Sequence, residues 1–435
     1  MRFETVKSVI LWALVVGSLL LSFALWNYKP EVEDLPPEQF QDRVDLGGDE
    51  ETKKNIIKPK SIIFRNEQHY YGFTDPNDSE TLYQDMHSWM LYDFRTEESR
   101  GRPTESNQLE VVFPTAIPMS MLDSLFTFNG DPLFPDWDFE RFFITFDEDD
   151  SSLQITFLDR KGDQQATAAV NNSETFSRLW QLLTTFEGLR EYAQFDKAEQ
   201  PIYIPKHAVE MANKSVAVRE IGSHSMVDVL FRNPDAVIRN QINDNEVYFT
   251  DNARGIMRVY QDRRTMEFQN PLQSPFEQME PAALLERSKN NINEYKGWTD
   301  DYHLMDIETS INTIRYQMFY DGYPVYGNNH ASMIEQQYRI KDLNQPNRYH
   351  RPLFSLANLL SSKTEELPSG ANVIDYLNNN KTYKPEQVDD IRIGYDLTYQ
   401  GESDALTLEA AWFINYKGCW QKMSSDDITL QKGGS

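Results

Sequence analysis

The feature that most constrains this chain is an uncharged apolar stretch near its start. Residues 8–26 read SVILWALVVGSLLLSFALW, which is 19 positions without a charge. As a helix that rises about 1.5 Å per residue, the stretch is about 28 Å long, close to the thickness of a bilayer's hydrocarbon core. We therefore predict a transmembrane helix over residues 8–27. Everything that follows must then fold outside the membrane.

The residues that flank the stretch predict its orientation. Two cations lie in the preceding segment, residues 1–7, and an excess of Lys and Arg favours the cytoplasmic side. Two aromatic residues follow at the other end, where such rings anchor at the membrane interface. We expect a single-pass protein of the cell membrane, with a cytoplasmic N-terminus and an extracellular C-terminal ectodomain. The predicted membrane-interface anchors are Arg2, Lys7, Trp26 and Tyr28.

A cleaved signal peptide is the alternative interpretation of this stretch. Ser22-Phe23-Ala24 is a small-x-small pattern that a signal peptidase could cut after Ala24. However, the apolar run is longer than a usual signal-peptide core, and Leu25-Trp26 continues it beyond that position. We therefore favour a retained anchor.

Small residues give the predicted helix two faces that could contact partner helices. Ala13, Gly17 and Ala24 lie within about 40° of one another at 100° per residue, and small residues let membrane helices approach closely. Two serines lie on the opposite side. Gly, Ala and Ser are also simply common in membrane spans, which is the alternative explanation. The predicted partner-helix contacts are Ile10, Ala13, Gly17, Leu20, Ala24, Ser18 and Ser22.

Composition restricts what the rest of the chain can be. With 435 residues, including 25 Phe, 22 Tyr and 8 Trp, the chain can form several domains with apolar cores. Its one cysteine, Cys419, excludes an intramolecular disulfide. Exported metazoan domains of this size usually contain several disulfides, so their absence favours a bacterial surface protein. The net charge of −26 argues against a nucleic-acid partner, because phosphate binding requires a basic surface.

Apolar periodicity after the span predicts an α+β ectodomain of antiparallel sheets with flanking helices. Residues 28–60 show no such period and contain Pro36-Pro37 and Gly47-Gly48, so an acidic linker is expected there and ordered structure is expected to begin near Ser61. An N-terminal α+β domain is predicted over residues 61–200. Its expected elements are a helix N-capped by Ser79, helices at 118–126 and 173–186, and strands at 109–113, 142–146, 153–159 and 165–170.

An internal repeat predicts a second, related domain. MSMLDSLF at 119–126 and HSMVDVLF at 224–231 share five of eight residues, and LQITFLDR at 153–160 parallels IMRVYQDR at 256–263 with nearly the same offset. Both copies are typical of a short helix followed by antiparallel strands. We therefore predict a middle α+β domain over residues 201–272 that is repeat-related to residues 107–170.

The remaining residues, 273–435, are predicted to form a C-terminal α+β domain. Asp321-Gly322 is a strong turn signal between two aromatic strands within residues 313–326. Lys417-Gly418 predicts a second turn. The other expected elements are helices at 281–295 and 373–378 and strands at 388–399 and 406–416.

The side chains that usually carry chemistry form no recognisable constellation here. The seven histidines include no HExxH pair, and the sequence has no Walker loop, GxGxxG or G-x-S-x-G motif. Cys419 lies beside Trp420 in a predicted strand, so we expect a buried core thiol rather than a nucleophile. We predict no catalytic residue, cofactor or metal site, and expect no enzyme activity.

Two further groups invite a functional interpretation that we do not favour. The carboxylates of residues 147–150 lack the spacing of an EF-hand loop and are expected to form a solvated hairpin tip rather than a calcium site. Tyr320, Tyr323 and Tyr326 could form a contact edge, but cross-strand or core packing is the favoured interpretation.

Four segments resemble the YycH family of low-GC Gram-positive bacteria. They are MRFETVKSVIL at 1–11, LWNYKP at 25–30, MFYDGYPVY at 318–326 and LEAAWF at 408–413, and the last two also resemble the related YycI proteins. The resemblance implies a non-enzymatic accessory regulator of the essential WalK (YycG) sensor histidine kinase, which controls cell-wall metabolism. It also implies a YycI-like single-span partner and contacts through transmembrane helices, with no catalytic residue.

Alternatives from other classes remain open at this point. The chain could be an anchored extracytoplasmic cell-wall enzyme or an enzyme inhibitor, because its carboxylates are too numerous to exclude a catalytic pair. It could also be a ligand-binding receptor close to the membrane, for which the sequence identifies no ligand.

Overall fold

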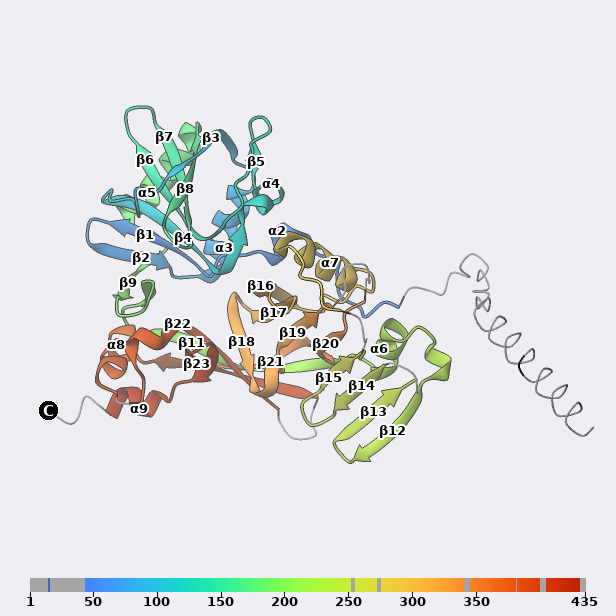
Figure 1. The fold of residues 1–435 in the computed structure, drawn as a ribbon. Coiled ribbons are helices and arrows are strands. Elements are labelled where there is room, and N and C mark those ends of the chain that lie inside the picture. Colours follow the sequence, from blue (N-terminus) through green and yellow to red (C-terminus); the bar gives the residue numbers. More distant parts are fainter. Residues whose placement is uncertain are drawn as a thin grey trace, which may run out of the picture. The chain divides into compact units, whose positions relative to one another are not determined.

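A computed structural model of the chain describes Val15 and residues 44–251, 255–271, 275–339, 345–380, 382–399 and 404–430 (Figure 1). Residues from 44 onward form one compact unit. Apart from Val15, which is helical, the predicted span lies outside the described residues, as do its interface anchors and its partner-helix contacts. Within the part of the chain that is described, no helix combines the length and the hydropathy that a membrane span requires.

The N-terminal lobe, residues 61–205, contains a ten-stranded sheet in the order β10-β9-β2-β1-β4-β6-β7-β8-β3-β5. All its strand pairs are antiparallel except β3 with β5. The strands are β1 (Ser61–Asn66), β2 (His69–Phe73), β3 (Met90–Glu98), β4 (Asn107–Pro118), β5 (Thr127–Phe128), β6 (Asp138–Asp147), β7 (Ser152–Asp159), β8 (Gln164–Val170), β9 (Leu189–Phe195) and β10 (Ile202–Pro205). The helical segments are α3 (Pro76–Met86), η1 (Met119–Met121), α4 (Leu122–Leu125) and α5 (Ser173–Thr185).

One face of this sheet is apolar and carries the helices. Phe64, Phe142 and Phe157 are fully buried there, and α3 and α5 pack on strands of the sheet. The predicted N-cap at Ser79 is wrong. The helix begins at Pro76 and is capped by Asp75, whose carboxylate accepts a hydrogen bond from the backbone N–H of Asn77. Proline favours the first helical position because it needs no N–H partner there, and this sets the earlier start.

The C-terminal lobe, residues 209–430, contains a fourteen-stranded sheet in the order β12-β13-β14-β15-β20-β19-β17-β18-β22-β23-β11-β21, with β16 on β17 and β24 on β23. The strands are β11 (Val209–Glu220), β12 (Ile238–Asn243), β13 (Glu246–Thr250), β14 (Ile256–Tyr260), β15 (Thr265–Gln269), β16 (Asp301–Glu308), β17 (Thr313–Tyr320), β18 (Tyr323–Gly327), β19 (Met333–Gln337), β20 (Arg348–Pro352), β21 (Phe354–Leu367), β22 (Val388–Tyr399), β23 (Ala405–Tyr416) and β24 (Cys419–Lys422). The helical segments are α6 (Ser223–Leu230), η2 (Pro234–Ala236), α7 (Pro281–Asn293), η3 (Asn328–His330), α8 (Gly370–Asn379), η4 (Pro385–Gln387) and α9 (Ser425–Leu430).

The prediction of sheets with flanking helices is confirmed, although β18 with β22 is a second parallel pair. Asp321 and Gly322 both have positive φ, 48° and 74°, as a two-residue hairpin turn requires. In both repeat copies a short helix, α4 or α6, precedes an antiparallel meander, β6-β7-β8 or β13-β14-β15. Because β15 pairs with β20, the second meander shares its sheet with the C-terminal strands. The boundary between a middle and a C-terminal domain at residue 272 stays a prediction.

Residues 44–60, which we call the strap, are ordered, so the expectation that structure begins near Ser61 is wrong. The strap includes α2 (Lys53–Ile56) and buries Leu46, Ile56 and Ile57. The N–H groups of Leu46 and Asp49 donate to the carbonyls of residues 295 and 298. The strap is thus held by a few apolar side chains and by backbone hydrogen bonds to a distant segment.

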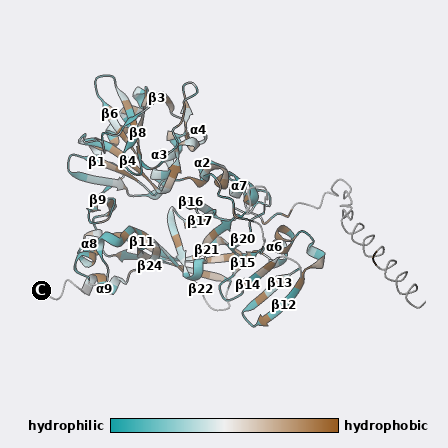
Figure 2. Cartoon of the chain, viewed as in Figure 1, coloured by the Kyte–Doolittle hydropathy of each residue, from teal (hydrophilic) through white to brown (hydrophobic). Residues whose placement is uncertain are grey.

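Buried side chains of the strap and both lobes form one contiguous hydrophobic core. Apolar positions are distributed along the strands of both lobes (Figure 2). In the N-terminal lobe the core is an aromatic cluster in which Phe142 contacts Phe126 edge-on and lies 5.3 Å from Phe157, centroid to centroid.

This packing predicts that Phe142→Ala lowers the free energy of unfolding by about 3–5 kcal/mol, because it removes a buried ring and leaves a cavity. Chemical denaturation of the full chain measures the effect. Leu133→Ala is the control, because Leu133 is 92% exposed and its truncation should change the stability by less than about 0.5 kcal/mol. Equal effects of the two substitutions would contradict the assigned core.

Candidate functional site

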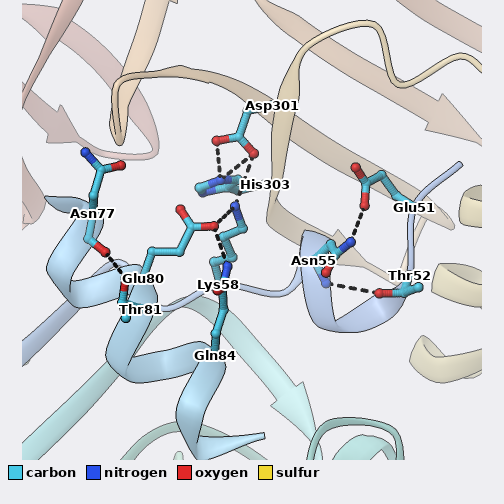
Figure 3. Close-up of polar contacts among 10 residues, drawn as sticks. All are labelled: Glu51, Thr52, Asn55, Lys58, Asn77, Glu80, Thr81, Gln84, Asp301 and His303. Carbon is cyan, nitrogen blue, oxygen red and sulfur yellow. Dashed lines mark hydrogen bonds and ion pairs between the residues drawn. The ribbon is translucent and has the colours of Figure 1, made fainter. Parts of the chain in front are cut away.

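The strap passes between the two lobes and contributes a cation to the contact between them. Lys58 Nζ lies 2.8 Å from Glu80 Oε1 on α3 and 3.2 Å from Asp301 Oδ1 on β16 (Figure 3). The Lys58 side chain is only 13% exposed, whereas those of Glu80 and Asp301 are 30% and 46% exposed, so solvent screens these contacts in part. One strap residue therefore connects a carboxylate of each lobe.

His303 extends this cluster within the C-terminal lobe. Its Nε2 lies 3.0 Å from both carboxylate oxygens of Asp301, and its ring stacks on Phe319 at 3.7 Å between centroids. Burial lowers the pKa of His303 in spite of the neighbouring carboxylate. A neutral ring then requires its proton on Nε2 in order to donate to Asp301.

A second ion cluster forms where the strap ends. Lys60 Nζ lies 2.8 Å from Asp390 Oδ2, and Arg392 Nη2 lies 2.6 Å from the same oxygen. The backbone N–H of Lys60 donates to the carbonyl of Val112 on β4, which fixes this residue to the N-terminal lobe as well. Burial alone would raise the pKa of Asp390, but the charges of Arg392 and Lys60 outweigh burial and hold it at about 2.

We call these two clusters the joint. Its members are Lys58, Lys60, Glu80, Asp301, His303, Asp390 and Arg392. A cavity of about 180 Å³ beside the joint is lined by both lobes, for example by Tyr203 and Tyr323. A larger polar cleft of about 1170 Å³ opens beside Asp390 and Arg392.

The hairpin turn after β17 also brings the lobes together. Gly322 at this turn approaches α3 so closely that an added Cβ would lie 2.5 Å from the Cβ of Pro76. Strand β16 contacts β4, and β10 contacts β22. The arrangement can therefore hold the lobes in one relative position through ion pairs and close packing.

None of the residues of this joint was predicted to be functional from the sequence. The partner-helix contacts and interface anchors belong to residues outside the described part of the chain. Within that part, no group of three or more His, Cys, Asp or Glu side chains could hold a metal ion. The carboxylates of residues 147–150 form an exposed hairpin tip, as predicted, where Asp147 Oδ1 accepts from the N–H groups of Asp149 and Asp150.

Two expectations about individual side chains are settled by the structure. Cys419 is exposed, so the prediction of a buried thiol is wrong. It begins the four-residue strand β24, in which only Trp420 is half-buried.

The three tyrosines of residues 320–326 pack across strands, which is the interpretation favoured from the sequence. Tyr326 is buried against Phe413 and Trp420, and Tyr320 and Tyr323 both contact Tyr395.

Comparisons with known proteins match the whole length of the chain. The family model for the YycH protein, N-terminal domain, matches residues 4–187, and the model for the YycH protein, C-terminal domain, matches residues 199–433. The two-component system WalR/WalK regulatory protein YycH of Bacillus subtilis (strain 168) is 22% identical over 462 residues, covering 100% of this chain and 99% of the relative. The crystal structure of YycH from Bacillus subtilis has a similar fold, with a TM-score of 0.71 and 18% identity over 87% of this chain and 99% of that chain.

The joint predicts that Asp390→Asn lowers the free energy of unfolding by about 3–5 kcal/mol at neutral pH, because two cations that are only 16% and 12% exposed lose their carboxylate. The pKa of Asp390 lies near 2 in the folded chain and its ordinary value is 3.8. The carboxylate's stabilisation is therefore fully present above about pH 4 and is lost as the pH falls through about 2.

Urea denaturation of both proteins at a series of pH values tests this expectation. The difference between the native chain and Asp390→Asn should shrink from pH 4 to pH 2. Asp149→Asn, at the exposed hairpin tip, is the control and should change stability by less than about 0.5 kcal/mol. A difference that is independent of pH would show that the ionised carboxylate does not hold the joint.

Proposed function

The chain belongs to the YycH family, and from this premise we propose that it is a membrane-anchored, non-enzymatic accessory regulator of a WalK-type sensor histidine kinase. The observation that supports the proposal most is the full-length match to a relative named as a WalR/WalK regulatory protein. A YycI-like single-span protein is the proposed second partner, and the kinase's role in cell-wall metabolism is the proposed context.

Regulation by such a protein requires a difference in affinity between two states of the kinase. A protein that binds both states equally shifts neither, however tightly it binds. In our proposal the helix at residues 8–27 binds one signalling state better than the other. The proposed contacts use the face of Ala13, Gly17 and Ala24, where small residues permit close approach.

In our proposal the strap is the route from the helix to the ectodomain. It follows residue 43 directly and contacts both lobes through Lys58 and Lys60. A change in the relative position of the lobes must alter the strap's contacts, because each of these lysines has partners in both lobes. In the proposed mechanism, partner or ligand binding to the ectodomain biases the helix through this segment.

Replacement of the smallest residue on the proposed contact face tests the helix contact. We expect Gly17→Leu to abolish co-purification of the kinase from native membranes, because the larger side chain prevents close helix packing, while membrane insertion stays intact. Val16→Leu, which places the same residue outside both proposed faces, is the control and should retain the kinase. Unchanged co-purification with Gly17→Leu would refute this contact.

Genetic complementation tests whether the anchor is required. We expect deletion of the gene to change kinase output, and the full chain to restore it. An exported version of residues 44–435 should fail to do so, because it lacks the helix that distinguishes the signalling states. Transcription from a kinase-dependent promoter is the readout, and immunoblotting confirms equal export. Full rescue by the soluble version would contradict the helix-centred mechanism.

A further inference from the structure

On the face of the N-terminal sheet opposite to its helices, polar and charged side chains lie beside a buried aromatic ring. Strand pairing places Arg65 on β1 directly opposite Gln108 on β4, and places Glu110 on β4 opposite Phe143 on β6. Residues in register on neighbouring strands project to the same face. These four side chains therefore lie beside one another, on the side away from the aromatic core.

A cavity of about 260 Å³ lies over this group. Its floor includes Arg65, Gln108, Glu110 and Phe143. Its walls include Tyr70 on β2, Gln194 on β9, Arg102 and Pro103 in the β3–β4 connection, and Pro201 and Tyr203 around β10. The cavity thus combines two guanidinium groups with aromatic surfaces.

The local charge is opposite in sign to that of the chain. The chain as a whole carries a net charge of −26. In the cavity, however, the negative charge of Glu110 is compensated by a buried cation outside the cavity lining, Arg141, whose Nη1 lies 2.5 Å from Glu110 Oε1. The hydroxyl of Tyr203 also donates to this carboxylate, at 2.8 Å. The cavity's own cations, Arg65 and Arg102, therefore leave an excess of positive charge.

These two cations have little else to neutralise them. Arg65 Nε donates to the backbone carbonyl of Glu67, and no carboxylate among the described residues forms an ion pair with Arg65. Arg102 Nη2 donates to the side-chain carbonyl of Gln200, and Arg102 Nη1 shares the Glu110 carboxylate with Arg141 through an ion pair of 3.5 Å. The Arg102 guanidinium also lies 5.8 Å from the centroid of the Phe143 ring.

Gln108 supplies an independent indication of a ligand. This side chain lines the cavity and is 5% exposed, and its Oε1 has no hydrogen-bond partner among the described residues. A buried polar atom without a partner costs about 1–3 kcal/mol, so such atoms are usually satisfied by something. In the orientation described, an acceptor oxygen occupies this position, and an anion requires the opposite amide orientation, rotated by 180°, in which the NH₂ group donates to it.

We propose that this cavity binds a small organic oxyanion, either a phosphate monoester or a carboxylate. Arg65 and Arg102 bind the anionic group, Gln108 donates to it, and the rings of Tyr70 and Phe143 contact the body of the ligand. A cavity of 150 Å³ accommodates benzene, so about 260 Å³ suits a ligand of about ten non-hydrogen atoms. Tyr203 also lines the cavity between the lobes, so the site adjoins the joint.

Calorimetric titration of the full chain at low ionic strength tests the site with four probes: phenyl phosphate, benzoate, inorganic phosphate and the neutral phenol. We expect saturable binding of phenyl phosphate or benzoate, weaker binding of inorganic phosphate, and none of phenol. Tighter binding of phenyl phosphate identifies the phosphate monoester class, and tighter binding of benzoate identifies the carboxylate class. A dissociation constant above about 10 mM for both aromatic anions, or equal binding of phenol, would overturn the proposal.

Variants separate the site from adventitious binding. Arg65→Gln and Arg102→Gln should each weaken anion binding by about 10–100-fold, because each removes a charge-assisted hydrogen bond. Arg100→Gln is the matched control, since the Arg100 side chain is 79% exposed and lies outside the cavity, and its affinity should stay within about twofold. Affinities that do not differ between these variants would place the anion elsewhere and overturn the proposal.

Gln108→Met distinguishes a binding role from a structural one. Methionine is close to glutamine in shape and removes the unpartnered polar atom. We expect the variant to unfold at a higher temperature without ligand, yet to bind the anion more weakly. A lower melting temperature together with unchanged affinity would show that Gln108 serves the fold rather than a ligand.

Discussion

The structure depends on one buried carboxylate, Asp390, which joins the strap to the C-terminal lobe. Its charge is compensated by Arg392 on the same strand and by Lys60 at the end of the strap. In a poorly solvated environment these charges are stable together and unfavourable apart. Because the backbone of Lys60 also bonds to β4, loss of this interaction would weaken the hold on the strap and the contact between the lobes together. The interaction therefore specifies one relative position of the lobes more than it adds net stability.

In the proposed mechanism, this constraint couples the relative position of the two lobes to the strap. The strap has no extensive secondary structure and holds its place through Leu46, Ile56, Ile57 and the two lysines. Each of these contacts involves a lobe, so lobe movement and strap release are coupled. An anion bound in the N-terminal lobe would act next to the same joint, because Tyr203 lines both cavities. These features suit a protein that alters a partner's equilibrium.

Local sequence patterns predicted the local structure well. The strands of the first meander, β14 of the second, α5, and the turn at Asp321-Gly322 each follow from alternation, repeat, helical periodicity or turn chemistry within a few residues. The N-cap of α3 was missed by four positions because Ser79 and Asp75 are both good caps, and Pro76 decides between them. Cys419 was misplaced because β24 is too short for alternation to indicate which side is buried.

The joint could not be predicted because its partners are far apart in sequence. Lys60 and Asp390 are 330 positions apart, and neither stands out from the many charges around it. The strap was mistaken for a linker because its three buried residues show no period and are surrounded by polar ones. A signal was present in the pair Ile56-Ile57, which would be unusual in a solvated tether. Arg65 and Gln108 likewise meet only through strand register.

Amide hydrogen exchange of the full chain tests the central claim, that the strap is an integral part of the folded two-lobed unit and is held by Asp390. The account predicts that the amides of Leu46 and Asp49 exchange nearly as slowly as those of β22, because they are bonded to the carbonyls of residues 295 and 298. It also predicts that Asp390→Asn accelerates exchange in the strap before it does so in β22. Strap amides that exchange at the rate of an unstructured chain would contradict the account.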